Sequence, residues 1–403
     1  MSVPATVRIG PAETTLIAQL TAHGAAAAAE RFAQSGLPTR KVETYHYTDL
    51  KMLLRAVPEL AGAEKATSEP ALRIPGAHRI PMTNGAADLD GTEPEGVRAA
   101  IVKGSALTER DDVLVRLNMA LAAETLKLDM DGAIGTVLHI DRRTEGDAGH
   151  MNDSVHLFLA DHGKATVIET FSGTDEVHLS NHASYVAVGR NAELTHILLD
   201  LSPARATNFA VAEYHIAEGA RLRTVTIHVG SVLSRFNLFA RFDGETAFGD
   251  FTGLNLVSDG QHSDITLELR HAVPRCGSQP LYKQVARGRS TAAFQGKIVV
   301  DRDAQKTDAK LMMQGLMLSD EAQILSKPEL EIFADDVVCG HGSTAGALDE
   351  DSLFYLMSRG VPRAEAESML VRGFIEEILD PIAEENLHEA LEGVVEAWLT
   401  AVK

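Results

Sequence analysis

The sequence predicts a mainly β protein whose strands stack into a solenoid, with helical segments at both ends of the chain. The first observation is a series of short runs, from about residue 133 to residue 333, in which apolar and polar residues alternate and turn residues intervene. The second is their spacing: Gly163, Asn191 and Gly219 precede strand-like runs at intervals of 28 residues, and Gly244 follows after 25. A strand–turn repeat of this size fits one coil of a solenoid, whereas a β-sandwich or barrel usually has less regular turns.

Residues 1–132 are expected to form an N-terminal helical domain with a linker. Alanine-rich and capped segments favour helices, and a segment rich in Pro, Gly and Ala favours a loop with short strands. The predicted elements are a helix over residues 11–36 that ends at Gly36, a helix capped by Thr48 that runs to Val57, a loop over residues 58–100 and a short helix over residues 118–124.

Residues 133–345 are expected to form the β-helix core. No helix of normal length fits between most of the strand-like runs, which argues against alternating β–α units. In a solenoid each coil buries its inward residues only against the coils on either side. The main runs are Thr136–Ile140, Val155–Leu159, Thr166–Thr170, Tyr185–Val188, Leu194–Leu201, Ala210–Ile216, Leu222–Val229, Asn237–Phe242, Ile265–Leu269 and Gly296–Val300.

Residues 346–403 are expected to form a C-terminal helical domain. Asp349 can cap a helix that Gly360 ends, and Pro362 can open the next helix at its first position. That helix carries apolar residues at three- and four-residue spacing, which gives it one apolar face. Pro381 breaks it, and a final helix continues through Trp398.

Composition and charge limit the classes of function. The chain has 403 residues and a formal charge of −20, which disfavours binding to nucleic acid and to anionic membranes. Only 5% of the residues are aromatic, which is few for a protein that stacks on sugars or bases. Two cysteines, no secretory signal in the first ten residues and no apolar run of membrane-spanning length favour a cytoplasmic protein with reduced thiols.

Cys339 and His341 are the candidate site for chemistry. Two residues apart in an extended segment, their side chains are expected on one face, where a thiolate and an imidazole can bind iron or another transition metal. The alternative is a small buried cysteine next to a turn histidine. Iron–sulfur clusters and structural zinc usually take four donors, mostly thiolates, and this chain has only two cysteines. The metal-binding hypothesis therefore requires a site at a subunit interface, with further donors from another molecule.

Other residues are given no chemical role. The sequence has no Gly-x-x-x-x-Gly-Lys-[Ser/Thr] motif, so the chain is not itself a P-loop ATPase. Eleven of the sixteen histidines fall between His139 and His271 without metal-ligand spacing, and we interpret them as structural or solvated. Cys276 follows Pro274 in a predicted turn and is also interpreted as structural.

Most of the chain resembles the SufB/SufD family of iron–sulfur cluster assembly proteins, most specifically from Tyr282 to Phe374, and the Cys-x-His-Gly form resembles the SufD type. The resemblance rests on these motifs: Gln305-Lys306-Thr307, Ser326–Ile332, Ala334–Val337, Cys339-x-His341-Gly342 and Leu353-Phe354-Tyr355-Leu356-x-Ser358-Arg359-Gly360. It implies a right-handed parallel β-helix flanked by helical domains. It also implies a non-catalytic scaffold subunit of a SUF complex, with a SufB-like paralogue and a SufC-like ABC ATPase that hydrolyses ATP.

The resemblance also implies roles for individual residues. His341 and Cys339 match residues at which a transient cluster, shared with the SufB-like partner and not permanently bound, is assembled. The helices after this motif match the element that docks the ATPase. Whether the isolated chain forms a homodimer is left open by the sequence. The docking residues implied in this way are Leu353, Phe354, Tyr355, Arg359 and Gly360.

Two alternatives remain open from the sequence. One is a β-helix enzyme that acts on polysaccharide, which the single tryptophan and the lack of a secretory signal disfavour. The other is the SufB-type scaffold itself, which would be expected to carry more cysteines.

Overall fold

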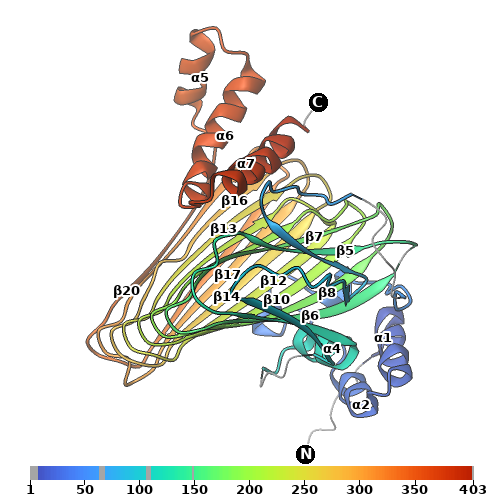
Figure 1. Ribbon diagram of the computed structural model, residues 1–403. Helices are drawn as coiled ribbons and strands as arrows, with labels where there is room; N and C mark the ends of the chain where they lie inside the picture. The colour runs from blue at the N-terminus through green and yellow to red at the C-terminus, as the bar shows by residue number, and fades with distance from the viewer. Residues whose placement is uncertain (1–7, 63–68, 106–109, 148, 402–403) are drawn as a thin grey trace, which may run out of the picture.

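Two sheets, wound by one continuous chain, form the body of the protein in a computed structural model that describes residues 8–62, 69–105, 110–147 and 149–401 (Figure 1). The chain alternates between the sheets, so that each coil adds one strand to each. In sheet A the strands lie in the order β3 (Val97–Lys103), β4 (Glu124–Met130), β6 (His150–Leu159), β8 (Leu179–Val188), β10 (Thr207–Ile216), β12 (Leu233–Phe242), β14 (His262–His271), β17 (Thr291–Val300) and β19 (Gln323–Ile332).

Sheet B forms the opposite wall of the solenoid. Its strands are β2 (Ala86–Ala87), β1 (His78–Thr83), β5 (Leu138–Thr144), β7 (Lys164–Gly173), β9 (Glu193–Asp200), β11 (Arg221–His228), β13 (Phe248–Val257), β16 (Leu281–Ala286) and β18 (Asp308–Met317), with β15 (Gly277–Ser278) between β13 and β18, and β20 (Val338–Ala347) beyond β18. Apart from β1 with β2 and β3 with β4, the strand pairs of the described residues are parallel. The prediction of a mainly β solenoid is therefore confirmed.

The repeat is set by one turn residue per coil that adopts a left-handed backbone. His162, Asn191, Gly219, Thr246 and Arg275 have φ between 55° and 66°. The fourth turn is thus at Thr246 and not at Gly244, which gives that coil 27 residues where the sequence indicated 25. The sequence missed this turn because a left-handed threonine is unusual and carries no local signal.

Inward side chains of both sheets form an apolar interior that runs along the axis. Leu138, Val167, Leu222 and Phe294, from four different strands, are at most 1% exposed. In a parallel pair, residues in register leave the sheet on the same face, so each inward side chain covers its counterpart in the next coil. Burial at any position therefore depends on the presence of the neighbouring coil.

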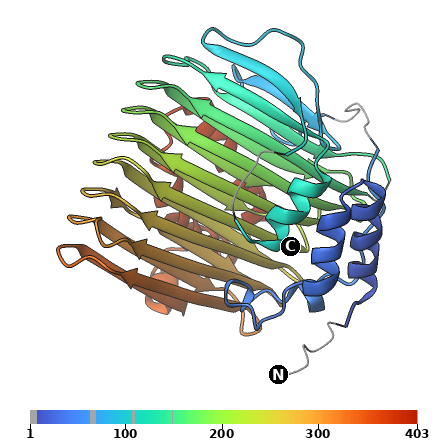
Figure 2. The same cartoon turned by 90° about the horizontal axis from the view of Figure 1, so that it is seen from below.

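The N-terminal helices cover part of the outer face of sheet A, beside the strands β8, β10 and β12 (Figure 2). They are α1 (Pro11–Ala22), α2 (Ala26–Ser35), η1 (Glu43–Tyr45), α3 (Leu50–Leu53) and α4 (Val113–Leu121). The predicted helix over residues 11–36 is two helices, because the chain turns at Gly24, whose φ is 81°.

Two further predictions for this region were wrong in detail. Asp49, not Thr48, caps α3 by accepting a hydrogen bond from the backbone N–H of Met52 at 3.1 Å, and the helix ends at Leu53. The helix expected over residues 118–124 begins earlier, because Asp112 caps it and accepts from the N–H of Leu114 at 2.8 Å. In both cases an aspartate carboxylate satisfies free amides of the first turn.

Three helices close the chain: α5 (Glu350–Ser358), α6 (Arg363–Leu379) and α7 (Glu385–Thr400). Asp349 caps α5, as predicted, and accepts from the N–H of Ser352 at 2.6 Å. Pro362 lies at the N-cap of α6, one residue before the predicted position. The second half of α6 and α7 pack on the apolar outer face of sheet B, whereas α5 and the first half of α6 project beyond the sheets (Figure 1).

Strands of the solenoid extend past the predicted core of residues 133–345: β1, β3 and β4 precede it, and β20 ends at Ala347. The domain limits themselves stay a prediction. Among the helices of the described residues, none has the length and apolar character that a membrane span requires. The expected lack of a secretory signal concerns residues 1–10, of which 1–7 lie outside the described residues.

Candidate functional site at the open end of the solenoid

The end of the solenoid formed by β19 and β20 is uncovered within the described residues. Each of these strands pairs along one edge only, β19 with β17 and β20 with β18. No residue of either strand is buried. Edge strands of this kind leave backbone N–H and C=O groups without partners, which another chain can pair with. This surface, named the open end below, is the outermost orange coil in Figure 2.

Cys339 and His341 lie on β20, with side chains in the inward register. Cys339 pairs with Ala309 and His341 with Leu311 of β18. Ala309 and Leu311 are at most 2% exposed, because β20 covers them, whereas Cys339 is half-buried and His341 is exposed. The two side chains therefore share a face, as their spacing predicts, and they face the end of the interior where a further coil would lie.

The thiol of Cys339 is not activated in the isolated chain. Burial, aided by the nearby charge of Asp308, raises its pKa. The thiol is therefore protonated at neutral pH, and a metal ion or a cation from a partner would be needed to convert it to the thiolate that binds iron.

This chain alone does not complete a metal site there. Among the described residues, no three His, Cys, Asp or Glu side chains come together in an arrangement that could hold a metal ion. Cys339 and His341 would supply one soft and one borderline donor, which suits iron or another transition metal, and the remaining donors would have to come from another molecule. The open end is the surface through which such a molecule would reach them.

A second candidate surface is the arm, defined here as residues Glu350–Leu370, which contains α5 and the first half of α6. Phe354 is 74% exposed and Tyr355 is 55% exposed, and Met357 and Met369 also expose much of their side chains. Large apolar side chains gathered on a projecting element indicate an interaction surface. Leu353, by contrast, is only 1% exposed and belongs to the arm's interior.

The other two residues implied for docking lie at the end of α5. The guanidinium of Arg359 lies 4.8 Å from the centre of the Tyr355 ring, so it can hold that ring in place. Gly360 has φ of 89° and ends the helix, a conformation that glycine adopts without strain. Of the five residues implied by the resemblance, Leu353 alone is buried, and the other four are exposed to a partner.

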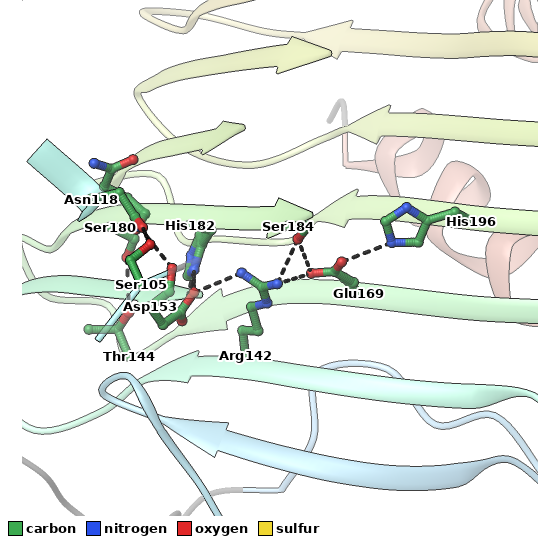
Figure 3. A network of polar contacts seen from close by, with 11 residues as sticks. Ser105, Asn118, Arg142, Thr144, Asp153, Glu169, Ser180, His182, Ser184 and His196 are labelled. Carbon is green, nitrogen blue, oxygen red and sulfur yellow. Dashed lines mark hydrogen bonds and ion pairs between the residues drawn. The ribbon is translucent and has the colours of Figure 1, made fainter. Parts of the chain in front are cut away.

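Sequence reasoning missed a buried ionic network inside the first coils (Figure 3). Arg142 on β5 donates to Asp153 Oδ1 at 2.7 Å and forms an ion pair with Glu169 on β7. His182 Nδ1 lies 2.9 Å from the Asp153 carboxylate, and His196 Nε2 lies 2.8 Å from that of Glu169. All five side chains are almost completely buried.

Charge balance keeps the two carboxyl groups of this network ionised. Burial opposes ionisation of Asp153, but His182 and Arg142 outweigh it and lower the pKa of that carboxyl. The same competition, with Arg142 and His196 as partners, lowers the pKa of Glu169. The network joins strands β5 to β9, so it fixes the register of these coils. The sequence signal that could have revealed it is an arginine at an inward-facing position, in the alternation Leu138, Ile140, Arg142.

Among the other mid-chain histidines, His139, His228 and His271 are buried, as is Cys276, whereas His162 and His215 are exposed, in line with the interpretation of these histidines as structural or solvated. Burial lowers the pKa of His139 and His271 to about 4 and that of His228 to about 3, so these side chains are neutral at pH 7. Cys276 is 1% exposed and contacts the backbone oxygen of Gly244 at 3.3 Å.

Comparison with known proteins gives consistent matches. The model of the family "SUF system FeS cluster assembly, SufBD core domain" matches residues 142–374, which include the open end and the arm. The iron–sulfur cluster assembly protein SufD of Escherichia coli is 29% identical over 378 residues, 89% of each chain. A SufBD family protein of Synechocystis is 36% identical over 51% of this chain and 45% of its own length, and one of Mycobacterium bovis is 30% identical over 69% and 64%.

Proposed function

Because this chain belongs to the SUF-system family of iron–sulfur cluster assembly proteins defined by the SufBD core domain, we propose that it is a non-catalytic, SufD-type scaffold subunit of a cluster assembly complex. Similarity to SufD over nearly the whole chain supports the SufD type over the SufB type. Nothing in the family match supports the polysaccharide-acting enzyme that a β-solenoid would also allow. The acidic, cysteine-poor composition supports a cytoplasmic location for the complex.

The open end carries this proposal, and its partner is a SufB-like paralogue. Two edge strands with unpaired backbone groups offer hydrogen bonds to another solenoid that ends in the same way. His341 and Cys339 sit at this surface as an incomplete donor set. Docking would bring further donors to them and bury them between the two chains, where the nascent cluster is assembled as cargo and then released.

The arm is the proposed docking surface for a SufC-like ATPase. The absence of a P-loop motif from the sequence means that ATP hydrolysis must be supplied by another subunit. Phe354 and Tyr355 present apolar area of the kind that forms the centre of protein interfaces. Since α6 continues from the arm onto sheet B, force applied to the arm reaches the solenoid directly.

Native mass spectrometry of the anaerobically purified complex tests this function. The chain is co-produced with SufB-like and SufC-like proteins, and subunit ratio, iron and sulfide are read together. We expect one copy of this chain with one SufB-like chain and two ATPase copies. A chain that stays alone in the presence of both partners would contradict the scaffold role.

A further inference from the structure

A short segment of the N-terminal region lies across the outer face of sheet A at the open end. We define the strap as Glu43–Thr48, which precedes α3 (Figure 2). Its residues bind groups on four successive strands, namely β12, β14, β17 and β19. No other strand follows β19 in sheet A among the described residues, so the strap reaches the last coil.

The anchor of the strap is a buried arginine on β12. Arg235 Nη2 donates to the backbone oxygen of Thr44 at 2.5 Å, and its guanidinium lies 4.1 Å from the centre of the Tyr45 ring. The Tyr45 hydroxyl donates to Asp112 Oδ2 at 2.8 Å, which connects the strap to the cap of α4. Arg235 and Tyr45 are at most 2% exposed, so this part of the strap is fixed.

The middle of the strap binds the next two strands. The Thr48 hydroxyl donates to Asp264 Oδ2 at 2.5 Å and lies 2.9 Å from His262 Nε2, both on β14. Gln295 of β17 donates through Nε2 to the backbone oxygen of Thr44 at 3.0 Å. Thr48 and Asp264 are completely buried, so these bonds are shielded from competing water.

The far end of the strap binds the edge strand. The Tyr47 hydroxyl donates to the backbone oxygen of Ser326 at 3.2 Å, and Lys327 forms an ion pair with Glu43. Ser326 in turn accepts a hydrogen bond at 3.0 Å from the hydroxyl of Ser343, on β20. Two side-chain hydrogen bonds thus connect the strap to a residue two positions from His341.

Edge coils need such support for a physical reason. In a solenoid each coil is held by its neighbours, so a terminal coil loses about half of its contacts and opens first. We propose that the strap is a positioning element for the open end: it holds β19, and through Ser326 and Ser343 also β20, in the arrangement that presents His341 to a partner. The part of this proposal that concerns partner binding rests on the proposed function, whereas the part that concerns β19 and β20 does not.

Hydrogen exchange of the full-length chain tests the structural part. The double variant Tyr47→Phe, Lys327→Met removes both bonds at the far end and leaves the buried anchor intact. We expect amide exchange in β19 and β20 to accelerate about tenfold, because the variant removes one neutral hydrogen bond and one partly exposed ion pair that add to the backbone pairing of these strands. Exchange in β8, five strands away from β19 in sheet A, should stay unchanged.

Two single variants are the controls. Lys327→Arg keeps the positive charge and should keep the slow exchange of β19. Lys164→Met removes a different interstrand ion pair, with Glu193, and should leave β19 and β20 as they are. Unchanged exchange at the open end in the double variant, or equal acceleration in β8, would overturn the proposal.

Affinity for the SufB-like partner tests the positioning part. Disorder at the open end weakens binding only by the factor by which the ordered fraction of chains falls, so affinity is compared with the ordered fraction that the exchange data give for each variant. A double variant whose ordered fraction falls to about a tenth should bind about tenfold more weakly, and an affinity that does not follow the ordered fraction would overturn the positioning role. If the unaltered chain itself binds no such partner, it is the proposed function that fails, and the exchange measurement still stands on its own.

Discussion

Removal of the Arg142 guanidinium is the perturbation for which the structure gives the sharpest expectation. Arg142→Met leaves the carboxylates of Asp153 and Glu169 buried without their arginine counter-charge, each with a histidine ring nitrogen still within hydrogen-bond distance. Breaking a buried ion pair by deleting one partner costs about 3 to 5 kcal/mol, because the remaining charge loses compensation where water cannot reach it. The first coils should therefore be strongly destabilised.

The matched control is Arg190→Met on the surface. Arg190 also bonds a carboxylate across neighbouring coils, with Nε at 2.8 Å and Nη2 at 2.6 Å from Asp161 Oδ2. Both side chains are well exposed, at 66% and 40%, and such pairs contribute about 0 to 1 kcal/mol. The two variants thus remove the same chemical group from opposite environments.

Hydrogen exchange over β5 to β8 measures the difference locally, which matters because a long solenoid need not unfold in one step. We expect the opening free energy there to fall by at least about 2 kcal/mol more for Arg142→Met than for Arg190→Met, a factor of roughly thirty in exchange rate. Adding Asp153→Asn and Glu169→Gln to Arg142→Met should restore part of the loss. Equal effects of the two arginine variants would refute the reasoning that burial of the network decides its contribution.

Three further predictions concern the site, the arm and pH. His341→Ala should impair cluster loading, measured as iron and sulfide per complex, while native mass spectrometry shows the complex intact; normal loading would show that this imidazole is not a donor. The double variant Phe354→Ser, Tyr355→Ser should weaken ATPase binding, measured by calorimetry, by at least about tenfold, because each ring would bury apolar area worth over about 1 kcal/mol in the interface. Unchanged affinity would place docking elsewhere. The pKa values of Asp153 and Glu169 lie below their ordinary 3.8 and 4.5, so the stabilisation that these carboxylates give is complete above about pH 4.5 and is lost as pH falls through the lowered values. In Asp153→Asn, the opening of β5 to β8, measured by hydrogen exchange, should therefore increase less steeply as the pH is lowered. An unchanged pH profile would contradict this.

The solenoid could be predicted from the sequence because turn residues with a local conformational preference recur at regular spacing. Asn191 and Gly219 take left-handed turns at positions where those residue types are favoured, so their spacing was visible. Thr246, Arg275 and Lys306 take the same conformation although these residue types do not favour it, so the repeat could not be recognised in the sequence toward the open end. There the fold is held by pairing between coils, which a single sequence does not display.

The site was predictable to a smaller degree. The two-residue spacing of Cys339 and His341 predicted a shared face, which the register of β20 on β18 confirms. Their roles as cluster donors stay a prediction. The role of Thr48 was misread, because its hydroxyl meets Asp264, a residue over two hundred positions away, and long-range contacts of this kind leave no trace in local pattern. The resemblance places Leu353 among the docking residues, whereas the structure buries its side chain; an apolar residue type is compatible with either position.

The half-buried position of Cys339 also bears on how the subunit survives before assembly. Peroxide attacks the thiolate, and burial keeps that form scarce by raising the pKa of the thiol. The unbound chain therefore keeps this sulfur mainly as the thiol, which peroxide attacks slowly, and under the proposed function a metal ion or a cation from the partner would draw the proton away. The rate of sulfenic acid formation at pH 7, compared with that of free cysteine, measures this protection.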